Sequence, residues 1–251
     1  MVPRALPFDS RNPLFLLGVL VVALAYSAVG HGGASGYLAL IAFTKMPPKD
    51  GATLALAINV VVAAIAFALY RRAKYFEWGL AWPLLAGSIP AAFLGGLAHL
   101  TDSVHRWVLA AVLLYAALTL MIKLPVEPDD LKKPSVGWLI LTGVAIGALS
   151  GMVGVGGGIF LSPILILSGW STAKTTASTS ALFILCNSLS GLAARSISVG
   201  AVVTANWPIL VIAVVGALIG SWIGAMKLSD VWLRRSLGAV MLVAVTKMIF
   251  G

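Results

Sequence analysis

Long apolar segments separated by short polar loops run along almost the whole chain. Continuous apolar stretches lie at 14–44, 51–70, 80–99, 105–122, 136–168, 175–194, 207–225 and 231–250. A helix needs about 20 apolar residues to cross the hydrocarbon core of a bilayer, so each stretch is of membrane-spanning length. The pattern predicts an all-α integral membrane protein with eight hydrophobic segments.

Two of these segments, 14–44 and 136–168, are too long for one straight crossing and carry glycines near their middle. About 31 residues would form a helix of roughly 46 Å, against a hydrocarbon core of about 30 Å. Clustered glycines weaken a helix. We therefore expect both segments to be broken at a glycine-rich turn, which survives in a bilayer only where protein buries it or a cavity wets it.

The glycine clusters belong to an internal duplication. The stretch GHGGASGYLA (30–39) returns as GVGGGIFLSP (154–163), at an offset of 124 residues. Further matches follow at an offset of 125: Trp82-Pro83 with Trp207-Pro208, Gly95 with Gly220, and Trp107 with Trp232. Duplicated apolar segments with the same glycine interruption in each copy are typical of secondary transporters.

The duplication divides the chain into four parts: an N-terminal tail (1–13), a first transmembrane repeat (14–122), a polar linker (123–135) and a second transmembrane repeat (136–251). If each first segment is a re-entrant hairpin, the homologous repeats of about four segments are inverted, and if it crosses once they are parallel. With the linker in the cytoplasm, both arrangements put ten Lys and Arg inside and seven outside. This count does not separate them. We favour inverted repeats, because broken helices at a two-fold axis are common in carriers.

Composition and charge restrict the class of function. The chain is 60% hydrophobic and 10% charged, so the bilayer must be its solvent. Its net charge of +9 comes from basic residues scattered through short loops, which suits lipid headgroups and argues against a nucleic-acid partner. All eight acidic residues lie outside the apolar segments or at their margins, which argues against a carboxylate-based cation carrier.

The glycine clusters are the first candidates for a substrate site. A glycine-rich turn exposes backbone N–H groups, and the positive end of the following half-helix adds to their attraction for an anion. Close helix packing is the alternative role for these glycines. His31 either contributes a proton or an anion contact, or makes only a backbone hydrogen bond. The candidates in the two clusters are Gly30, His31, Gly32, Gly33, Gly154, Gly156, Gly157 and Gly158.

A second polar feature is the hydroxyl-rich start of segment 175–194. Hydroxyls can cap a helix or bond between helices, but their density after a glycine break indicates the lining of a pathway. The first-half counterpart, 51–60, keeps only Thr53 and Asn59, so we expect an asymmetric site. The candidates from these two stretches are Asn59, Thr179, Ser180 and Asn187.

One enzymatic motif is present in weak form. Gly33 to Gly36 spell the GxSG of intramembrane serine proteases around Ser35, and His99 is an available partner. The second copy has no serine at the matching position. Since metalloprotease, phosphate-loop, CxxC and nucleotide motifs are also missing from the sequence, we predict a non-enzyme with no catalytic residue, metal or cofactor.

The second half combines a glycine motif, a following proline, a Thr-Ser pair and a later serine and glycine, at Gly154, Gly156, Gly157, Gly158, Pro163, Thr179, Ser180, Ser188 and Gly191. This motif resembles the sulfite exporter TauE/SafE family, and the resemblance spans nearly the whole chain. The first half departs from the family pattern at His31, Leu56 and Ala57. The resemblance implies a multi-pass protein of the bacterial cytoplasmic (inner) membrane that moves sulfite, sulfonates or similar small sulfur-containing anions.

We therefore expect a secondary transporter that moves such an anion by alternating access, with export favoured by the resemblance alone. Its site should lie near mid-membrane between the glycine turns, with Thr179, Ser180 and Asn187 on one wall and His31 and Asn59 opposite. The expected partners are the anion, the lipid bilayer and a second copy, in a homodimer formed through small-residue helices. The alternative is an anion channel or a transporter of an unrelated small solute.

Overall fold

The computed structural model describes residues 12–41, 44, 46–97, 114, 118, 131–195 and 199–250, and within them it confirms the all-α prediction. The helices are α1 (Pro13–Ala28), α2 (Ala34–Ile41), α3 (Pro48–Arg72), α4 (Trp78–Leu97), α6 (Val136–Val153), α7 (Gly158–Leu167), α8 (Ala173–Arg195), α9 (Val199–Ala205), α10 (Trp207–Met226) and α11 (Asp230–Phe250). Within this part of the chain, five helices are long and apolar enough to cross a membrane: α3, α4, α6, α8 and α10. Outside the described residues lie the predicted segment 105–122 except for positions 114 and 118, His99, tail residues 1–11 and linker residues 123–130.

Both predicted breaks are present. Helix α1 ends at Ala28 and α2 begins at Ala34, while α6 ends at Val153 and α7 begins at Gly158. Five glycines in the two gaps have a positive φ: Gly30 (74°), Gly33 (93°), Gly154 (77°), Gly156 (76°) and Gly157 (82°). Other residue types adopt this left-handed conformation at a cost of about 1–2 kcal/mol, so the clustered glycines determine where the helices stop.

Local signals place the other helix boundaries. Helix α1 begins where the Asn12 side chain accepts a hydrogen bond from the Leu14 amide at 2.9 Å, and α6 begins with Ser135 in the same role. Trp207-Pro208 opens α10, a position that suits proline. Its counterpart Trp82-Pro83 instead lies inside α4, which begins at Trp78. The stretch before α10 therefore differs between the halves, and it contains the short helix α9.

The most extensive contacts join a helix of one half to a helix of the other half, and we call these the exchanged pairs. Helix α4 packs on α6, and α1 packs on α10. Glycines of α6 lie against carbonyl groups of α4, in the pairs Gly143–Leu84, Gly147–Ser88 and Gly151–Ala92. Glycines of α10 lie against α1 in the same way, in the pairs Gly216–Leu20, Gly220–Leu24 and Gly224–Ala28. These small residues serve packing inside one chain, so they do not support the homodimer, which stays a prediction.

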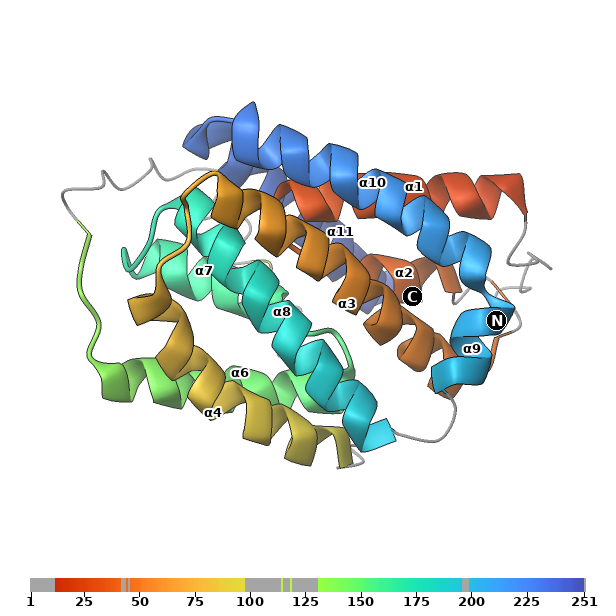
Figure 1. Cartoon of the computed structure of the whole chain (residues 1–251), viewed down its shortest axis with the longest axis horizontal. Coiled ribbons are helices and arrows are strands. Elements are labelled where there is room, and N and C mark those ends of the chain that lie inside the picture. The colour runs from red at the N-terminus through yellow and green to blue at the C-terminus, as the bar shows by residue number, and fades with distance from the viewer. Residues whose placement is uncertain are drawn as a thin grey trace.

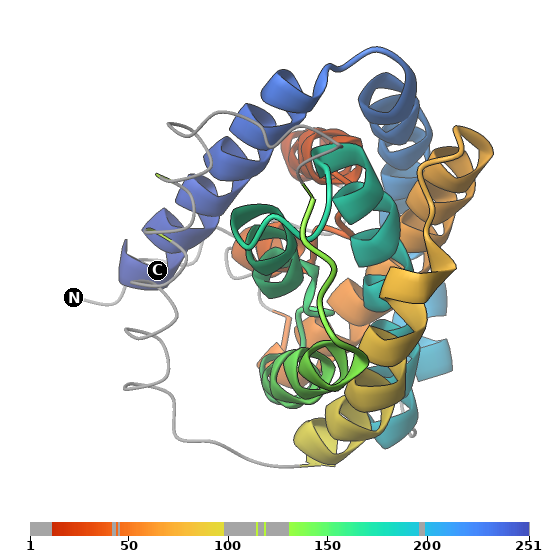
Figure 2. The ribbon, with the colours of Figure 1, turned by 90° about the vertical axis from the view of Figure 1, so that its left-hand side faces the viewer.

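Helices α3 and α8 lie side by side between the two exchanged pairs (Figure 1). The start of α8 lies beside the end of α3, where Lys174 donates a hydrogen bond to the Tyr75 hydroxyl at 3.0 Å. The two helices therefore run in opposite directions. The short helix α7 lies in the interior, between α11 and the layer of α3 and α8 (Figure 2). The second glycine turn therefore opens onto the middle of the protein.

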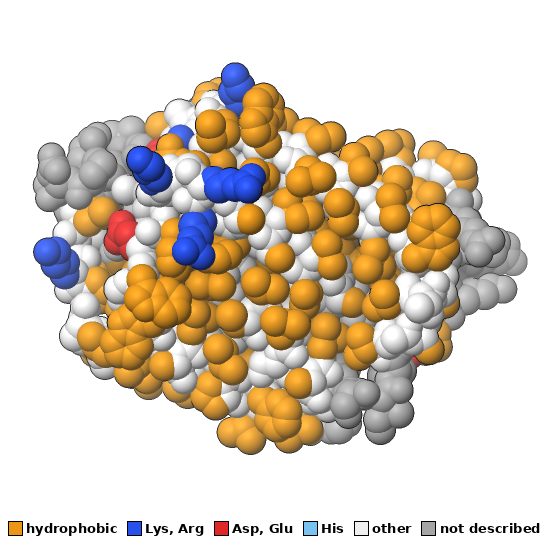
Figure 3. Space-filling model, in the orientation of Figure 1, with side chains coloured by type: hydrophobic (Ala, Val, Ile, Leu, Met, Phe, Trp, Pro, Cys, Tyr) orange, Lys and Arg blue, Asp and Glu red, His pale blue; other side chains and the backbone are white. Residues whose placement is uncertain are grey.

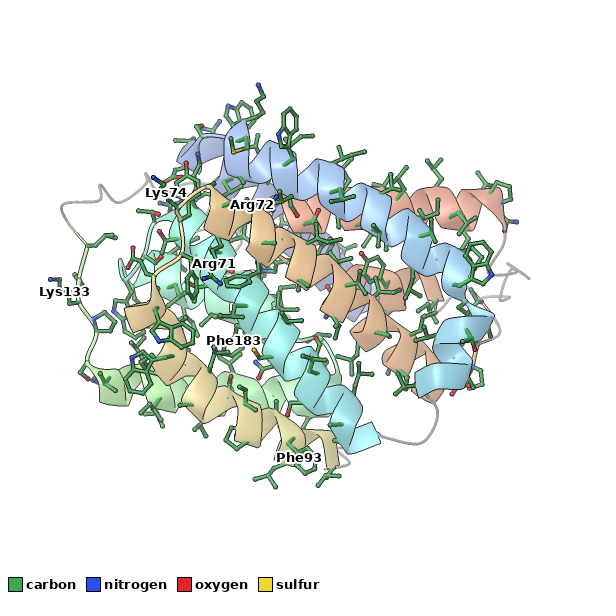
Figure 4. All side chains as sticks on the ribbon, viewed as in Figure 1. Arg71, Arg72, Lys74, Phe93, Lys133 and Phe183 are labelled. Carbon is green, nitrogen blue, oxygen red and sulfur yellow. The ribbon has the colours of Figure 1, made fainter. Side chains whose placement is uncertain are left out.

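The surface combines a wide apolar face with a basic end. Figure 3 shows apolar side chains over most of one face and Lys and Arg gathered toward one end. Arg71, Arg72, Lys74 and Lys133 lie at this end, where α3 ends and the chain enters α6 (Figure 4). Exposed tryptophans stand at nearby helix ends, among them Trp78, Trp138 and Trp232. Apolar sides with tryptophans and basic residues at their margins are what a lipid bilayer selects.

Candidate functional site

The two glycine turns meet at one side chain, Asn59 in the middle of α3. A Cβ atom added to Gly32 would collide with Asn59 Oδ1. A Cβ added to Gly156 would lie 2.9 Å from Asn59 Nδ2 and 2.9 Å from the Cγ2 atom of Ile184 on α8. The two turns therefore face each other across Asn59, and only glycine leaves room for the carboxamide between them; a substrate site at this place stays a prediction.

The Asn59 carboxamide is completely buried but weakly held. Its Nδ2 atom donates long hydrogen bonds to Val155 O at 3.5 Å and to Ser188 Oγ at 3.4 Å. Its Oδ1 atom has no hydrogen-bond partner among the described residues. An unsatisfied buried polar atom costs about 1–3 kcal/mol, so the group is poised to form better hydrogen bonds with another molecule. Rotating the carboxamide would turn donors instead of an acceptor toward Gly32.

His31 links the first glycine turn to the second half through hydroxyl groups. It is 2% exposed, and its Nδ1 atom lies 3.0 Å from Val29 O. On the other side of the ring, Nε2 lies 3.4 Å from Ser162 Oγ, which is 2.8 Å from Ser180 Oγ. A hydroxyl can donate to a neutral imidazole or accept from a protonated one. His31 thus has a backbone contact at Nδ1 and a hydroxyl at Nε2 that can pair with either protonation state of the ring, so its role stays a prediction.

The remaining glycines of the two turns have different surroundings. Gly158 lies beside His31 and against Ile184, so it joins the group around Asn59. Gly30 packs on the backbone of Ala177, Gly33 on the ring of Tyr37, and Gly157 on Phe183 and Ser150. Gly154 terminates α6, and its N–H donates to Ser150 O at 2.8 Å. These four are explained by packing and helix termination.

The three residues of the predicted wall, Thr179, Ser180 and Asn187, lie within about 100° of one another around α8 but differ in their contacts. Ser180 contacts Ser162, whereas Thr179 is one residue earlier and lies about 100° away around the helix. Thr179 Oγ1 and both polar side-chain atoms of Asn187 are buried and unpartnered within the described part of the chain. Ser180 therefore belongs to the group near the glycine turns, while the sites of Thr179 and Asn187 stay predictions.

Sequence reasoning missed Ser162 and left Ser188 as a motif residue only. Ser162 connects His31 to Ser180, and Ser188 contacts Asn59. A search for residues repeated in both halves could not find Ser162, because position 38 at the matching offset is a leucine. The signal that could have found it is a hydroxyl directly before Pro163 in a very apolar short helix.

The protease-like serine has a local explanation. Ser35 Oγ lies 3.0 Å from the hydroxyl of Tyr26, so α1 and α2 are joined across the first glycine turn. His99, its expected catalytic partner, lies outside the described residues. The GxSG match is thus accounted for by helix-to-helix hydrogen bonding.

Comparisons with known proteins identify the family. The model of the family described as sulfite exporter TauE/SafE matches residues 14–248. The chain is 34% identical over 245 residues to the "Probable membrane transporter protein y4hK" of Sinorhizobium fredii, covering 93% of this chain and 96% of that protein. No solved structure matches significantly. This chain therefore belongs to the sulfite exporter TauE/SafE family and is a multi-pass membrane transporter, not an enzyme.

Proposed function

We propose that the protein is a secondary transporter that exports sulfite or a small organosulfur anion across the bacterial cytoplasmic membrane by alternating access. The observation that carries this proposal is the meeting of Gly32 and Gly156 across the buried, incompletely bonded carboxamide of Asn59. The family description supplies the class of solute, and the direction of transport follows from it alone.

The chemistry around the turns favours an anion. Helices α2 and α7 begin directly after the two glycine turns, and the first N–H groups of a helix have no partner within it. No side chain caps the N-terminus of α7, whose N-cap residue is Gly157. Hydrogen bonds to a charged acceptor contribute about 1.5–3 kcal/mol each, so converging N–H groups could offset much of the desolvation of a small anion.

Paired contacts support two homologous repeats. Gly95 lies against the carbonyl of Ala148, and its counterpart Gly220 lies against the carbonyl of Leu24, which is the counterpart of Ala148. Gly32 and its counterpart Gly156 both face Asn59 and Ile184, two positions 125 residues apart. A contact that recurs at the offsets of the duplication is what a two-fold relation between the halves requires.

The direction of the central helices supports inverted repeats. Helix α8 occupies the place in the second repeat that α3 occupies in the first, and the two helices are antiparallel. Parallel repeats related by an axis along the membrane normal would make these counterparts run the same way. An axis in the membrane plane, as in many carriers, makes them antiparallel.

The basic end of the bundle supplies the orientation. Nine described Lys and Arg belong to the helix ends at this side: Arg71, Arg72, Lys74, Lys132, Lys133, Lys174, Lys227, Arg234 and Arg235. Three described basic residues, Lys49, Arg195 and Lys247, belong to the opposite helix ends. By the positive-inside rule, the basic end faces the cytoplasm.

Purified protein in liposomes should show saturable sulfite flux, because a carrier turns over at a limited number of sites. Flux should be measured with sulfate, sulfoacetate and taurine as competitors, and the competitor that blocks it would define the preferred anion. Flux that rises without saturation would instead indicate a channel. Folded protein without flux of any of these anions would refute the proposed solute class.

Substituting Asn59→Ile should lower flux about tenfold or more while the thermal midpoint in detergent changes little. The counterpart position holds Ile184, which also faces both turns, so isoleucine is the apolar side chain that the duplication itself supplies, and the hydrogen-bonding carboxamide is lost. Losing one hydrogen bond to a charged ligand accounts for this magnitude. Asn206→Ile is the matched control, since Asn206 bonds Val202 near α9. Equal flux in both variants would remove Asn59 from the site.

A further inference from the structure

The hydrogen bonds of His31 determine which of its ring nitrogens exchanges a proton. Nδ1 lies 3.0 Å from Val29 O, and a carbonyl oxygen only accepts hydrogen bonds. Nδ1 therefore carries a hydrogen in both protonation states of the ring. The second proton is gained or lost at Nε2, which lies 3.4 Å from Ser162 Oγ.

The two hydroxyls beyond Nε2 can satisfy both protonation states. When the ring is neutral, Ser162 donates to Nε2 and accepts from Ser180, whose Oγ atom is 2.8 Å away. When the ring is protonated, Nε2 donates to Ser162, and Ser162 donates to Ser180. Ser180 can then donate to the carbonyl one turn earlier in α8, as serine hydroxyls in helices do. A proton can thus be added without leaving any group of this chain unpaired.

The duplication does not repeat this polar chain. The counterparts of the imidazole and its two hydroxyls are Val155, Leu38 and Ala55. Val155 and Leu38 both pack against an apolar cluster that contains Ala55. The chain therefore lies on one side of the glycine turns, and a proton held there would be one per transporter.

The surroundings of the His31 ring are neutral. Its hydrogen-bond contacts are a carbonyl and a hydroxyl, and its Cδ2 atom lies 3.6 Å from a Cβ added to Gly158. Helices α1, α2, α7 and α10 contain no charged residue. The charged residues of α3, α8 and α11 stand in the first two turns or the last turn: Lys49, Asp50, Arg71, Arg72, Lys174, Arg195, Asp230, Arg234, Arg235 and Lys247. The other titratable residues on the helices around the turn are Tyr26, Tyr37, Tyr70 and Cys186.

A protonated His31 would therefore require a negative charge from outside the protein. Within the described part of the chain, no acidic side chain contacts the ring, and Asp50 is nine residues before Asn59, about 14 Å along α3. A buried charge in a membrane protein is costly unless it is paired. Gly32, the next residue after His31, faces the space beside Asn59. An anion between the glycine turns would supply the missing charge at the same turn.

We propose that His31 is a proton-binding site and that the transporter takes up one proton on Nε2 together with each anion. The anion neutralises the imidazolium, and the imidazolium in turn strengthens anion binding. By linkage these two effects are equal in free energy. That the anion is a sulfur oxyanion rests on the proposed function.

NMR of protein labelled with ¹⁵N-histidine measures the protonation of His31, and the His31→Gln variant identifies its signal. Saturating sulfite should raise the pH at which half of the His31 rings are protonated by about one unit or more, a tenfold tighter hold on the proton. Ser162→Ala should lose most of this shift, whereas Ser162→Thr, which keeps the hydroxyl, should retain it. Ser190→Ala is the matched control, since Ser190 is a buried serine of α8 that bonds Ile89 O. An unchanged midpoint in the presence of bound sulfite would overturn the proposal.

A pH gradient across proteoliposomes tests the coupling itself. Methanesulfonate has no titratable proton near neutral pH, so its accumulation reports a proton carried by the protein. With the membrane potential clamped at zero, one pH unit should concentrate it about tenfold on the alkaline side if one proton accompanies each anion. The His31→Gln variant should only equalise the two concentrations.

The two measurements separate this proposal from the proposed function. Saturable sulfite flux with an unchanged His31 midpoint and no accumulation of methanesulfonate would refute the proton site and leave the solute class standing. A midpoint raised by methanesulfonate in protein that shows no sulfite flux would retain the proton site and refute the solute class.

Discussion

Replacing Gly156 by alanine is expected to lower sulfite flux about tenfold or more in protein that remains folded. Gly156 has a φ of +76°, and an added Cβ would lie 2.9 Å from Asn59 Nδ2 and 3.0 Å from Ser188 Oγ. The methyl group would push the carboxamide toward Gly32 and fill the space in which we place the anion. A displacement of about 1 Å at a reacting or binding centre can cost about a hundredfold in rate.

Gly169→Ala provides the matched control for this substitution. Gly169 also has a positive φ, +69°, but an added Cβ would meet no atom within 4 Å. Both variants bear the same backbone strain of about 1–2 kcal/mol, and only Gly156→Ala changes the site. Flux and thermal midpoint should be measured for both. If the two variants transport equally well, the space between the glycine turns does not hold the solute.

The largest loss of stability is expected from Gly151→Ala, at about 3 kcal/mol, because α4 and α6 touch through their backbones at this point. An added Cβ would collide with the carbonyl oxygen of Ala92 and lie 2.7 Å from the amide nitrogen of Gly96. Neither atom can move without separating the two helices, and overpacking of this kind costs about 1–3 kcal/mol or more. Unfolding in detergent, followed by circular dichroism, measures the change.

The same substitution elsewhere in α6 should have the opposite sign. Gly137 stands near the start of the helix with no atom within 4 Å of an added Cβ. Gly137→Ala should therefore be neutral or stabilise the protein by up to about 1 kcal/mol, as expected from helix propensity. If Gly151→Ala and Gly137→Ala changed the free energy of unfolding by the same amount, the close α4–α6 contact at Gly151 would not be the cause of the loss.

The elements of this fold follow from local physics and were therefore predictable. Unbroken apolar runs gave the helices, and positive-φ glycines stopped them at Ala28 and Val153, inside the predicted breaks. Gly95 and Gly220, which match across the duplication, each lie against a backbone carbonyl. These features depend on a residue and its near neighbours along the chain.

Contacts between distant segments were less accessible to sequence reasoning. Asn59 was a candidate because it stands in the first-half counterpart of the polar helix, but its position between Gly32 and Gly156 depends on the packing of α3 against both turns. Ser162 joins His31 only because α7 folds into the interior. The burial of Arg234, in the second turn of α11, likewise depends on how α11 packs against other helices such as α8.

Because α1 and α10 come from different halves, the exchanged pairs also determine the order in which the helices can pack during synthesis. Helix α1 packs mainly on α10, whose first residue follows Ala28 by roughly 180 positions. At a synthesis rate of about 5–20 residues per second, α1 waits roughly 10–40 s in the membrane before its partner exists. During that interval its glycine-matched face has no protein surface to cover it. Lipid or the insertion machinery must therefore cover the glycine-matched face of α1 until α10 is made. Neither half can complete its packing before the other has been synthesised.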